Sequence, residues 1–216
     1  VMALMAGVFS AYRFEQFASL LGFIAACYLA ILMMFIVHAL ILVLSGNNPV
    51  HYFKTVWPVL TFAFVTRSSA ASIPLAISAQ EKFGVQNTIA NIAASFGSSM
   101  GQNGCAGIYP AIMVAMIAPT IGIEPLSVHF LLAMLPAIAL GSIGVAGVGG
   151  GGTFAALIVL STLNFPVALV GIFIAIEPVV DMARTALNVN GSMMSGVLAN
   201  RLLKKSAEKP QPVNAN

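Results

Sequence analysis

The segment Gly141–Thr153, GSIGVAGVGGGGT, lies between two apolar arms that are each too short to cross a membrane. The arm before it is VHFLLAMLPAIAL (128–140), and the arm after it is FAALIVLSTL (154–163). A spanning helix needs about 20 apolar residues. Irregular backbone at membrane depth is tolerated only inside protein or beside a wet cavity. Two short arms with such a tip therefore predict a hairpin that enters the bilayer and returns to the same side.

The segment FVTRSSAASIP (64–74), earlier in the chain, predicts a first hairpin of the same kind. The short apolar arms TVWPVLTFAFVT (55–66) and LAISA (75–79) flank its serine-rich tip. Each predicted hairpin precedes a helix with a polar stretch. The first hairpin precedes GSSMGQNGCAG (97–107), and the second precedes EPVVDMARTALNVNGSMMSG (177–196). Paired broken segments in two halves are typical of secondary transporters built on inverted repeats. The alternative is an ordinary helical bundle with accidental polar breaks, but both breaks would then have to coincide with short arms.

The composition indicates an integral membrane protein. Hydrophobic residues make up 59% of the 216 residues and charged residues 7%, against about 25% charged in soluble domains. The clearest span is Phe17–Leu44, and we expect His38 within it to hydrogen-bond a neighbouring helix rather than bind a metal. Cys27 and Cys105 are too few and too far apart for a disulfide framework or a transition-metal site. No basic patch favours nucleic acid, and no catalytic triad pattern favours an enzyme.

The chain begins in an apolar run without a start methionine, which suggests the C-terminal part of a longer transporter. We expect the last scaffold helices at 1–48 and a transport domain at 49–205. The domain divides into a first hairpin, an interrupted helix, a second hairpin and a last polar helix, at 49–84, 86–118, 125–164 and 166–203. A disordered tail is expected at 206–216.

Basic residues flank the first hairpin and crowd the C-terminal end, whereas the connections around the second hairpin carry none. They are Lys54, Lys82, Arg201, Lys204, Lys205 and Lys209. Because cytoplasmic loops carry an excess of Lys and Arg, we expect the first hairpin and the C terminus to face the cytoplasm.

Six polar side chains share one face of the predicted last helix. With 3.6 residues per turn they fall within about 100° of each other: Glu177, Asp181, Arg184, Thr185, Asn188 and Ser192. A charge at the bilayer centre is costly unless paired or hydrated, so this stripe should face a bundle interior or a cavity. An internal Asp181–Arg184 ion pair that only staples helices is one explanation, although such pairs often stabilise no better than apolar residues.

The functional explanation is that Asp181 and Arg184 divide a zwitterionic ligand. Arg184 would hold a carboxylate with its planar fork, and Asp181 would accept hydrogen bonds from an ammonium group. The ligand would then be an amino acid, preferably one with a second acid group. The two predicted hairpin tips could add main-chain N–H groups for a carboxylate.

Together, FVTRSSAASIP, GSIGVAGVGGGGT and DMARTALNVNG resemble the dicarboxylate/amino acid:cation symporter family, with its glutamate-transporter-like fold. Within it, GQNGCAG and GSIGVAGVGGG are most similar to bacterial L-cystine uptake transporters. The resemblance implies an all-α integral membrane protein with two re-entrant helical hairpins and inverted repeats. It also implies a homotrimer in the bacterial inner membrane, whose transport domains move like elevators.

Carried over position by position, the resemblance implies that Asp181 binds the substrate amino group and Arg184 a distal carboxylate. Further substrate-binding positions are Ser69, Cys105, Val148, Gly149, Thr185 and Asn188. Cys105 and Gly149, where the family has Thr and often Pro, would suit a longer substrate.

Sodium-coupled members carry Asn-Met-Asp-Gly-Thr where this chain has Gly101–Cys105, and an Asp where it has Ser192. Without these carboxylates, buried sodium sites should be weakened, so the coupling ion could be Na⁺ or H⁺. The candidate cation positions are Gly97, Ser99, Gly101, Asn103, Ser142, Ile143, Val145, Asn188 and Ser192.

We therefore expect a symporter that imports L-cystine or a related amino acid. A sodium- or proton-coupled glutamate, aspartate or dicarboxylate symporter is the alternative, and an anion channel or membrane sensor of the same fold is a third possibility.

Overall fold

The fold is given by a computed structural model that describes residues 14–143, 145, 147–167 and 170–207. These residues contain no strand, only helices and one isolated bridge between Met100 and Ile143, which confirms the all-α prediction. The elements are α2 (Phe14–Leu44), α3 (Pro49–Thr66), α4 (Ser69–Lys82), α5 (Asn87–Gly97), the π-helix η1 (Asn103–Ile108), α6 (Tyr109–Ile117), the 3₁₀-helix η2 (Ala118–Ile121), α7 (Val128–Gly141), α8 (Gly151–Thr162), α9 (Val170–Ile174) and α10 (Glu177–Ala207).

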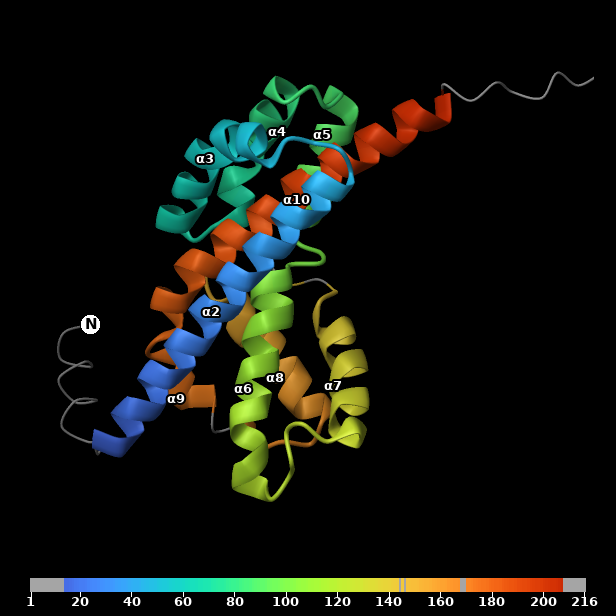
Figure 1. The fold of residues 1–216 in the computed structure, drawn as a ribbon. Coiled ribbons are helices and arrows are strands. Elements are labelled where there is room, and N and C mark those ends of the chain that lie inside the picture. Colours follow the sequence, from blue (N-terminus) through green and yellow to red (C-terminus); the bar gives the residue numbers. More distant parts are fainter. Residues whose placement is uncertain (1–13, 144, 146, 168–169, 208–216) are drawn as a thin grey trace, which may run out of the picture.

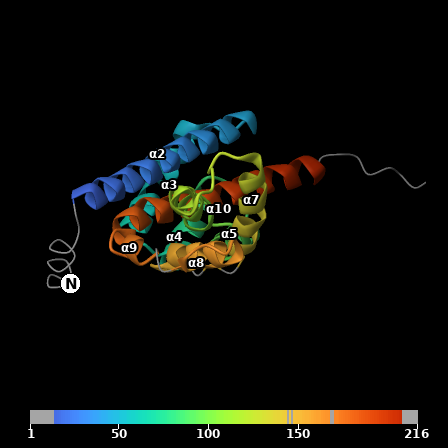
Figure 2. The same cartoon turned by 90° about the horizontal axis from the view of Figure 1, so that it is seen from below.

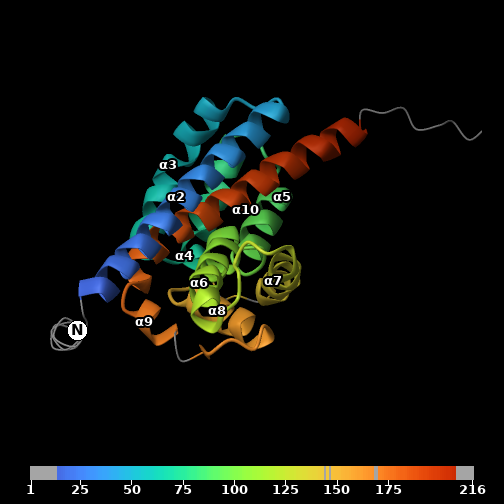
Figure 3. The ribbon, with the colours of Figure 1, turned by 60° about the horizontal axis from the view of Figure 1, so that its bottom comes forward.

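Two long helices, α2 and α10, run side by side through the molecule (Figure 1). Helices α3, α4 and α5 pack at one end of this pair, and α6, α7 and α8 at the other (Figure 1). From below and at an intermediate angle, α2 and α8 lie on opposite sides of the bundle (Figures 2 and 3). The polar part of α10 therefore lies between the two groups of short helices.

Each group of short helices has its own apolar core against the long pair. One core joins α2, α6, α7 and α8 around Phe23, Tyr109 and Leu160, and the other joins α3, α4, α5 and α10 around Tyr52 and Met193. The outer face of α2 remains apolar and exposed, with Leu32, Met33, Ile36 and Leu40 between 54% and 59% exposed. Such a face suits lipid or further protein rather than water.

Helices α3 and α4 form a tight hairpin. Asn48 begins α3, because its side-chain oxygen accepts from the backbone N–H of Val50 and His51. Arg67 ends α3 in the left-handed conformation, φ 53°, and Ser68 then caps α4 by accepting from Ala71 N. The reversal thus takes only two residues, and a side-chain cap on each helix compensates for the lost helical bonds.

Helices α7 and α8 form the second hairpin, in which Ser127 caps α7 and Gly150, at φ 92°, precedes α8. At 1.5 Å per residue, the 14 residues of α4 and α7 extend about 21 Å and the 12 of α8 about 18 Å. Helix α3 has 18 residues, about 27 Å, because the Asn48 cap starts it at Pro49, before the apolar run TVWPVLTFAFVT (55–66). The segments long and apolar enough to cross a membrane are Leu20–Leu44 and Asn103–Ile121, among the described residues.

Two other segments depart from continuous helix. Between α5 and η1 the chain passes through Gly101, φ 67°, before the π-helical turn. The stretch predicted as one helix over 166–203 is divided into α9 and α10. The reason is Pro178, which fits the first turn of α10 but cannot donate to a preceding turn. Helix α10 continues to Ala207, so the first two residues of the predicted tail are helical, and 208–216 lie outside the described residues.

Candidate functional site

Arg184 is the centre of a buried charged cluster on α10. Its Nη2 donates to Glu177 Oε1 at 2.7 Å and to Asp181 Oδ1 at 3.1 Å, and the side chain is 0% exposed. The guanidinium also lies over the Tyr109 ring of α6, 3.9 Å from its centroid. Two carboxylates and one guanidinium leave the cluster one negative charge in excess when all three are ionised.

Several buried polar atoms of this cluster have no hydrogen-bond partner among the described residues. They are Nε and Nη1 of Arg184, Oδ2 of Asp181 and the hydroxyl of Tyr109. A buried unsatisfied donor or acceptor costs roughly 1–3 kcal/mol, so native proteins retain few of them. The unused donors suit a carboxylate, and the unused Asp181 oxygen suits an ammonium group.

Asn188 joins α10 to the π-helical segment. Its Oδ1 accepts from the main-chain N–H of Gly104 at 2.8 Å, and its Nδ2 donates to Gln102 Oε1 at 3.1 Å and to Cys105 Sγ at 3.0 Å. Gln102 in turn donates to the Val145 carbonyl of the second hairpin at 3.3 Å. One amide side chain therefore fixes the unwound turn of the interrupted helix on the charged stripe.

The second hairpin closes over the cluster with glycines. A Cβ at Gly152 would overlap Arg184 Nη1 and lie 2.8 Å from its Cζ, so only glycine fits there without displacing the guanidinium. A Cβ at Gly149 would lie 3.8 Å from Asp181 Oδ2 and 4.0 Å from Arg67 Nη2. The tip of one hairpin thus lies between Asp181 and the Arg67 guanidinium of the other.

The two tips are also bonded to each other. The Gly147 carbonyl accepts from the backbone N–H of Ala70 at 3.0 Å and from the Ser68 hydroxyl at 3.3 Å. A Cβ at Gly147 would overlap the Ser98 carbonyl, so the interrupted helix packs against the same point. Three chain segments that are far apart in sequence therefore meet beside the charged cluster.

Of the eight predicted substrate positions, five meet in one network. The bonds above join Asp181 to Arg184 and Asn188 to Cys105. Cys105 Sγ donates to Asp181 Oδ1 at 3.8 Å and the Thr185 hydroxyl donates to the same oxygen at 3.5 Å, which links all five. Gly149 lies beside this network. The buried Ser69 starts α4 next to the bonded tips, whereas the Val148 side chain is 54% exposed.

The predicted cation positions lie in separate places. Gly97 is packed directly on Ser192, Asn103 bonds to His38, and Asn188 belongs to the charged network. The remaining candidates are Ser99 and Gly101, between α5 and η1, and Ser142, Ile143 and Val145, which follow α7; the main chain of Ile143 bridges Met100. The bond of Asn103 confirms that His38 hydrogen-bonds a neighbouring helix.

Four further residues belong to the site without having been predicted from the sequence: Gln102, Tyr109, Gly152 and Arg67. Gln102 stands in the predicted unwound turn and Arg67 at a predicted hairpin tip, so a polar residue at a predicted break in the helix was an available signal. Nothing in the sequence indicates that Tyr109 would lie under Arg184.

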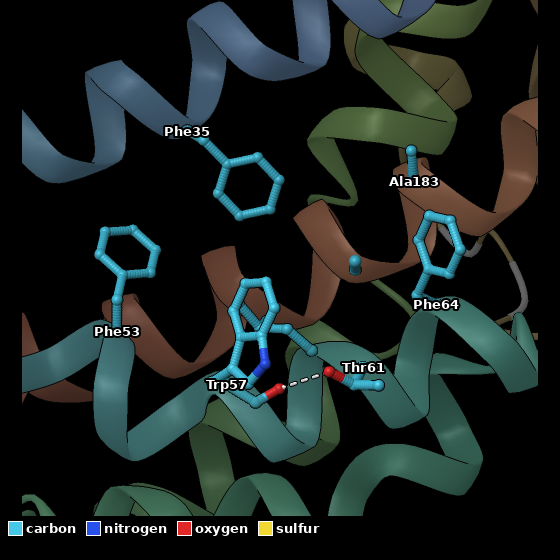
Figure 4. A pocket seen from close by; sticks show the side chains of 8 residues that line it. Phe35, Phe53, Trp57, Thr61, Phe64 and Ala183 are labelled. Carbon is cyan, nitrogen blue, oxygen red and sulfur yellow. Dashed lines mark hydrogen bonds between the residues drawn. The ribbon is translucent and has the colours of Figure 1, made fainter.

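An apolar hollow of about 450 Å³ lies away from these charges, between α2, α3 and α10. Figure 4 shows its rings, with Phe35 on α2 and Phe53, Trp57 and Phe64 on α3. Its polar groups are the Trp57 indole N–H and the Thr61 hydroxyl, which already donates to the Trp57 carbonyl at 3.1 Å. This lining of described residues suits an apolar chain and contains no charged side chain for a charged substrate.

The model of the sodium:dicarboxylate symporter family matches residues 1–202. The chain belongs to this family. The family is one of membrane-embedded symporters, so the resemblance found in the motifs is confirmed.

Relatives within the family are similar along most of the chain. The L-cystine uptake protein TcyP of Bacillus cereus is 54% identical over 204 residues, 94% of this chain and 44% of that protein. The TcyP of Bacillus licheniformis is 53% identical over 202 residues, with the same coverage. An uncharacterized symporter of Haemophilus influenzae is 52% identical over 206 residues, 95% of this chain and 47% of that protein. The chain spans less than half the length of these relatives.

Proposed function

We propose that this protein is a secondary active symporter that imports L-cystine or a closely related amino acid. The observation that carries the proposal is the pair of unused groups in the buried cluster, the N–H donors of Arg184 and the Oδ2 acceptor of Asp181. An α-amino acid carries both complementary groups. The cystine uptake proteins among the relatives support cystine as the first substrate to test.

The charges near the tips favour a substrate with two ends. Arg67 adds a second guanidinium beside Gly149, and Glu177 adds a second carboxylate beside Arg184. L-cystine carries two carboxylates and two ammonium groups, and its Cα atoms lie roughly 4.4–6.8 Å apart across the disulfide. Glutamate, aspartate or a dicarboxylate would use fewer of these groups and remains the second candidate.

For the mechanism, we propose that the α3–α4 and α7–α8 hairpins are re-entrant and that this part of the protein moves across the membrane as an elevator, in a homotrimer. Hairpin arms of about 18–27 Å are shorter than the roughly 30 Å hydrocarbon core, which supports this arrangement. Arg201 and Lys204 line a hollow with Asn47 and Phe83 at one end of the bundle. By the positive-inside rule, this end and the C terminus would be cytoplasmic, in the bacterial inner membrane.

The test is uptake of labelled L-cystine by the full-length protein in proteoliposomes, with and without internal unlabelled cystine. Saturable counterflow is expected from a symporter, because a carrier exchanges bound substrate. Conductance without exchange would refute the proposal in favour of a channel. Exchange of aspartate but not cystine would restore the acidic amino acids as substrates. The family description suggests Na⁺ as the coupling ion, so a sodium gradient and a choline control belong in the same experiment.

A further inference from the structure

His38 is a buried titratable side chain that the charged cluster does not use. It lies within α2, is 2% exposed, and contacts amide groups with both ring nitrogens. Nδ1 lies 2.8 Å from Asn190 Nδ2 of α10, and Nε2 lies 3.1 Å from Asn103 Nδ2 of η1. The other histidines, His51 and His129, are exposed. Ionisable residues inside membrane bundles mark ion pathways and proton relays.

The surrounding amides can accommodate either protonation state of the ring. A neutral imidazole has one donor and one acceptor nitrogen, whereas the protonated ring has two donors. The oxygen and nitrogen of an Asn amide exchange places on a 180° rotation and are assigned from their bonds. Asn103 Oδ1 is buried without a partner among the described residues. Rotation of the Asn103 amide would let this oxygen accept a hydrogen bond from His38 Nε2–H.

Asn190 can rotate in the same way because of Tyr52. The Tyr52 hydroxyl lies 3.2 Å from both the main-chain oxygen and the Oδ1 of Asn190. When Asn190 Oδ1 turns to the His38 ring, Asn190 Nδ2 can donate to the Tyr52 oxygen. The Tyr52 hydroxyl still donates its hydrogen bond to the main-chain oxygen of Asn190. Two Asn oxygens would then hold an imidazolium with the hydroxyl still satisfied.

Charged groups do not compete for this ring. The titratable or charged side chains on the parts of α3, η1, α6 and α10 nearest to it are Tyr52, Cys105, Tyr109, Asp181 and Arg184. Of these, only Tyr52 joins the His38 network, which consists of His38, Asn103, Asn190 and Tyr52. The other four belong to the charged cluster. Arg184 precedes Asn190 by six residues, about 9 Å along α10.

The His38 network is connected to the proposed substrate site by one peptide. Asn103 contacts His38, and the next residue, Gly104, donates its N–H to Asn188. Both residues lie in η1, and π-helical turns are frequent at functional sites. A change in the His38 charge would therefore alter the same turn that holds Asn188, which is a contiguous route for coupling.

We propose that His38 binds the proton that is transported together with the substrate. Because His38 bonds to Asn103 of η1 and Asn190 of α10, α2 then moves with the transport domain rather than staying in the scaffold expected for 1–48. The ring nitrogen without hydrogen takes a proton from the side on which substrate enters, and releases it on the other side after the elevator movement. The inference rests on the proposed transport function and goes beyond it by assigning the coupling residue.

The experiment uses the full-length protein in sodium-free proteoliposomes, with two readouts for labelled L-cystine. Counterflow reports transport, and accumulation under an inward proton gradient reports coupling. For one proton per substrate, a gradient of one pH unit can drive about a tenfold accumulation. We expect this accumulation in the parent and in the matched control His129→Gln. In His38→Gln, whose amide can still bond to Asn103 and Asn190, accumulation should fall to about onefold while counterflow remains measurable.

The outcomes separate the two proposals. Absence of counterflow in the parent overturns the transport function and this inference with it. Two results overturn the inference alone. One is counterflow in the parent without accumulation under the proton gradient, and the other is gradient-driven accumulation that persists in His38→Gln. If His38→Gln fails to fold, Asn103→Asp decides. A carboxylate beside the His38 ring favours its protonated form by roughly 1–3 pH units. Proton-driven accumulation in Asn103→Asp should therefore persist to a pH at least about one unit higher than in the parent. An unchanged pH profile in a folded Asn103→Asp protein also overturns the inference.

Discussion

Gly152 lies where the first turn of α8 meets the guanidinium of Arg184, and replacing it by alanine tests the closed site directly. A Cβ at this position would be 2.8 Å from Arg184 Cζ and would overlap Nη1. Ordinary carbon contacts are about 3.5–4.0 Å, so the guanidinium must move by roughly 1 Å. Its bonds to Glu177 and Asp181, now 2.7 and 3.1 Å, would then exceed the usual hydrogen-bond range of about 2.7–3.2 Å.

The expected loss follows from these two bonds. A hydrogen bond to a charged group contributes about 1.5–3 kcal/mol, and about 1.4 kcal/mol corresponds to tenfold in binding. If the displaced guanidinium loses one of the two bonds, Gly152→Ala should weaken L-cystine binding by roughly 10- to 100-fold, or lower the Tm if the strain is taken up in the free protein.

Titration calorimetry and thermal unfolding of the full-length protein in detergent measure the two effects. Gly22→Ala, at a helical position with nothing within 4 Å, is the matched control and should bind as the parent does. Unchanged affinity together with an unchanged Tm in Gly152→Ala would show that α8 does not close on Arg184.

Three further substitutions have defined outcomes. Asp181→Asn should weaken amino acids by at least about tenfold more than plain dicarboxylates in competition assays, because only an ammonium group needs the carboxylate; equal losses contradict the assignment. Asn188→Leu should lower stability by about 1–3 kcal/mol in thermal unfolding, since the buried Gly104 N–H loses its acceptor, and an unchanged Tm would argue against the bond. Gly97→Ala should destabilise by overlap with the Ser192 side chain. Adding Ser192→Gly should recover part of the lost Tm, because the Ser192 Cα stays 3.1 Å from the new Cβ and glycine weakens the helix; a double variant no better than Gly97→Ala would place the strain elsewhere.

The fold class followed from local signals in the sequence. Apolar arms, glycine tips and caps act over a few residues, so the all-α chain and its family were recognisable before any contact was known. The facing of Asp181, Arg184 and Asn188 followed from helical periodicity alone. The division of the last helix before Glu177 was also accessible, since Pro178 is a local signal for a helix start.

The remaining features of the site depend on contacts between distant segments. Tyr109 under Arg184, Gly152 beside it and Asn103 on His38 each join residues at least 32 positions apart. Spacing within one helix cannot indicate which side chain of another helix lies opposite. Glycine at 152 was visible as part of a glycine run, but only the packed structure distinguishes the position that a Cβ would fill.

The polar stripe of α10 also bears on how this protein enters the membrane during synthesis. Despite its 31 residues, α10 is not among the segments apolar enough to cross a membrane by themselves. Asp or Arg at a helix centre costs about 2.5–3.5 kcal/mol on the insertion scale. The charges of the stripe pair within α10, and the groups of other helices that contact the stripe, in η1 and α6, precede α10 in the chain. The translocon can therefore release α10 into the bilayer only after those helices have assembled into a surface that receives it.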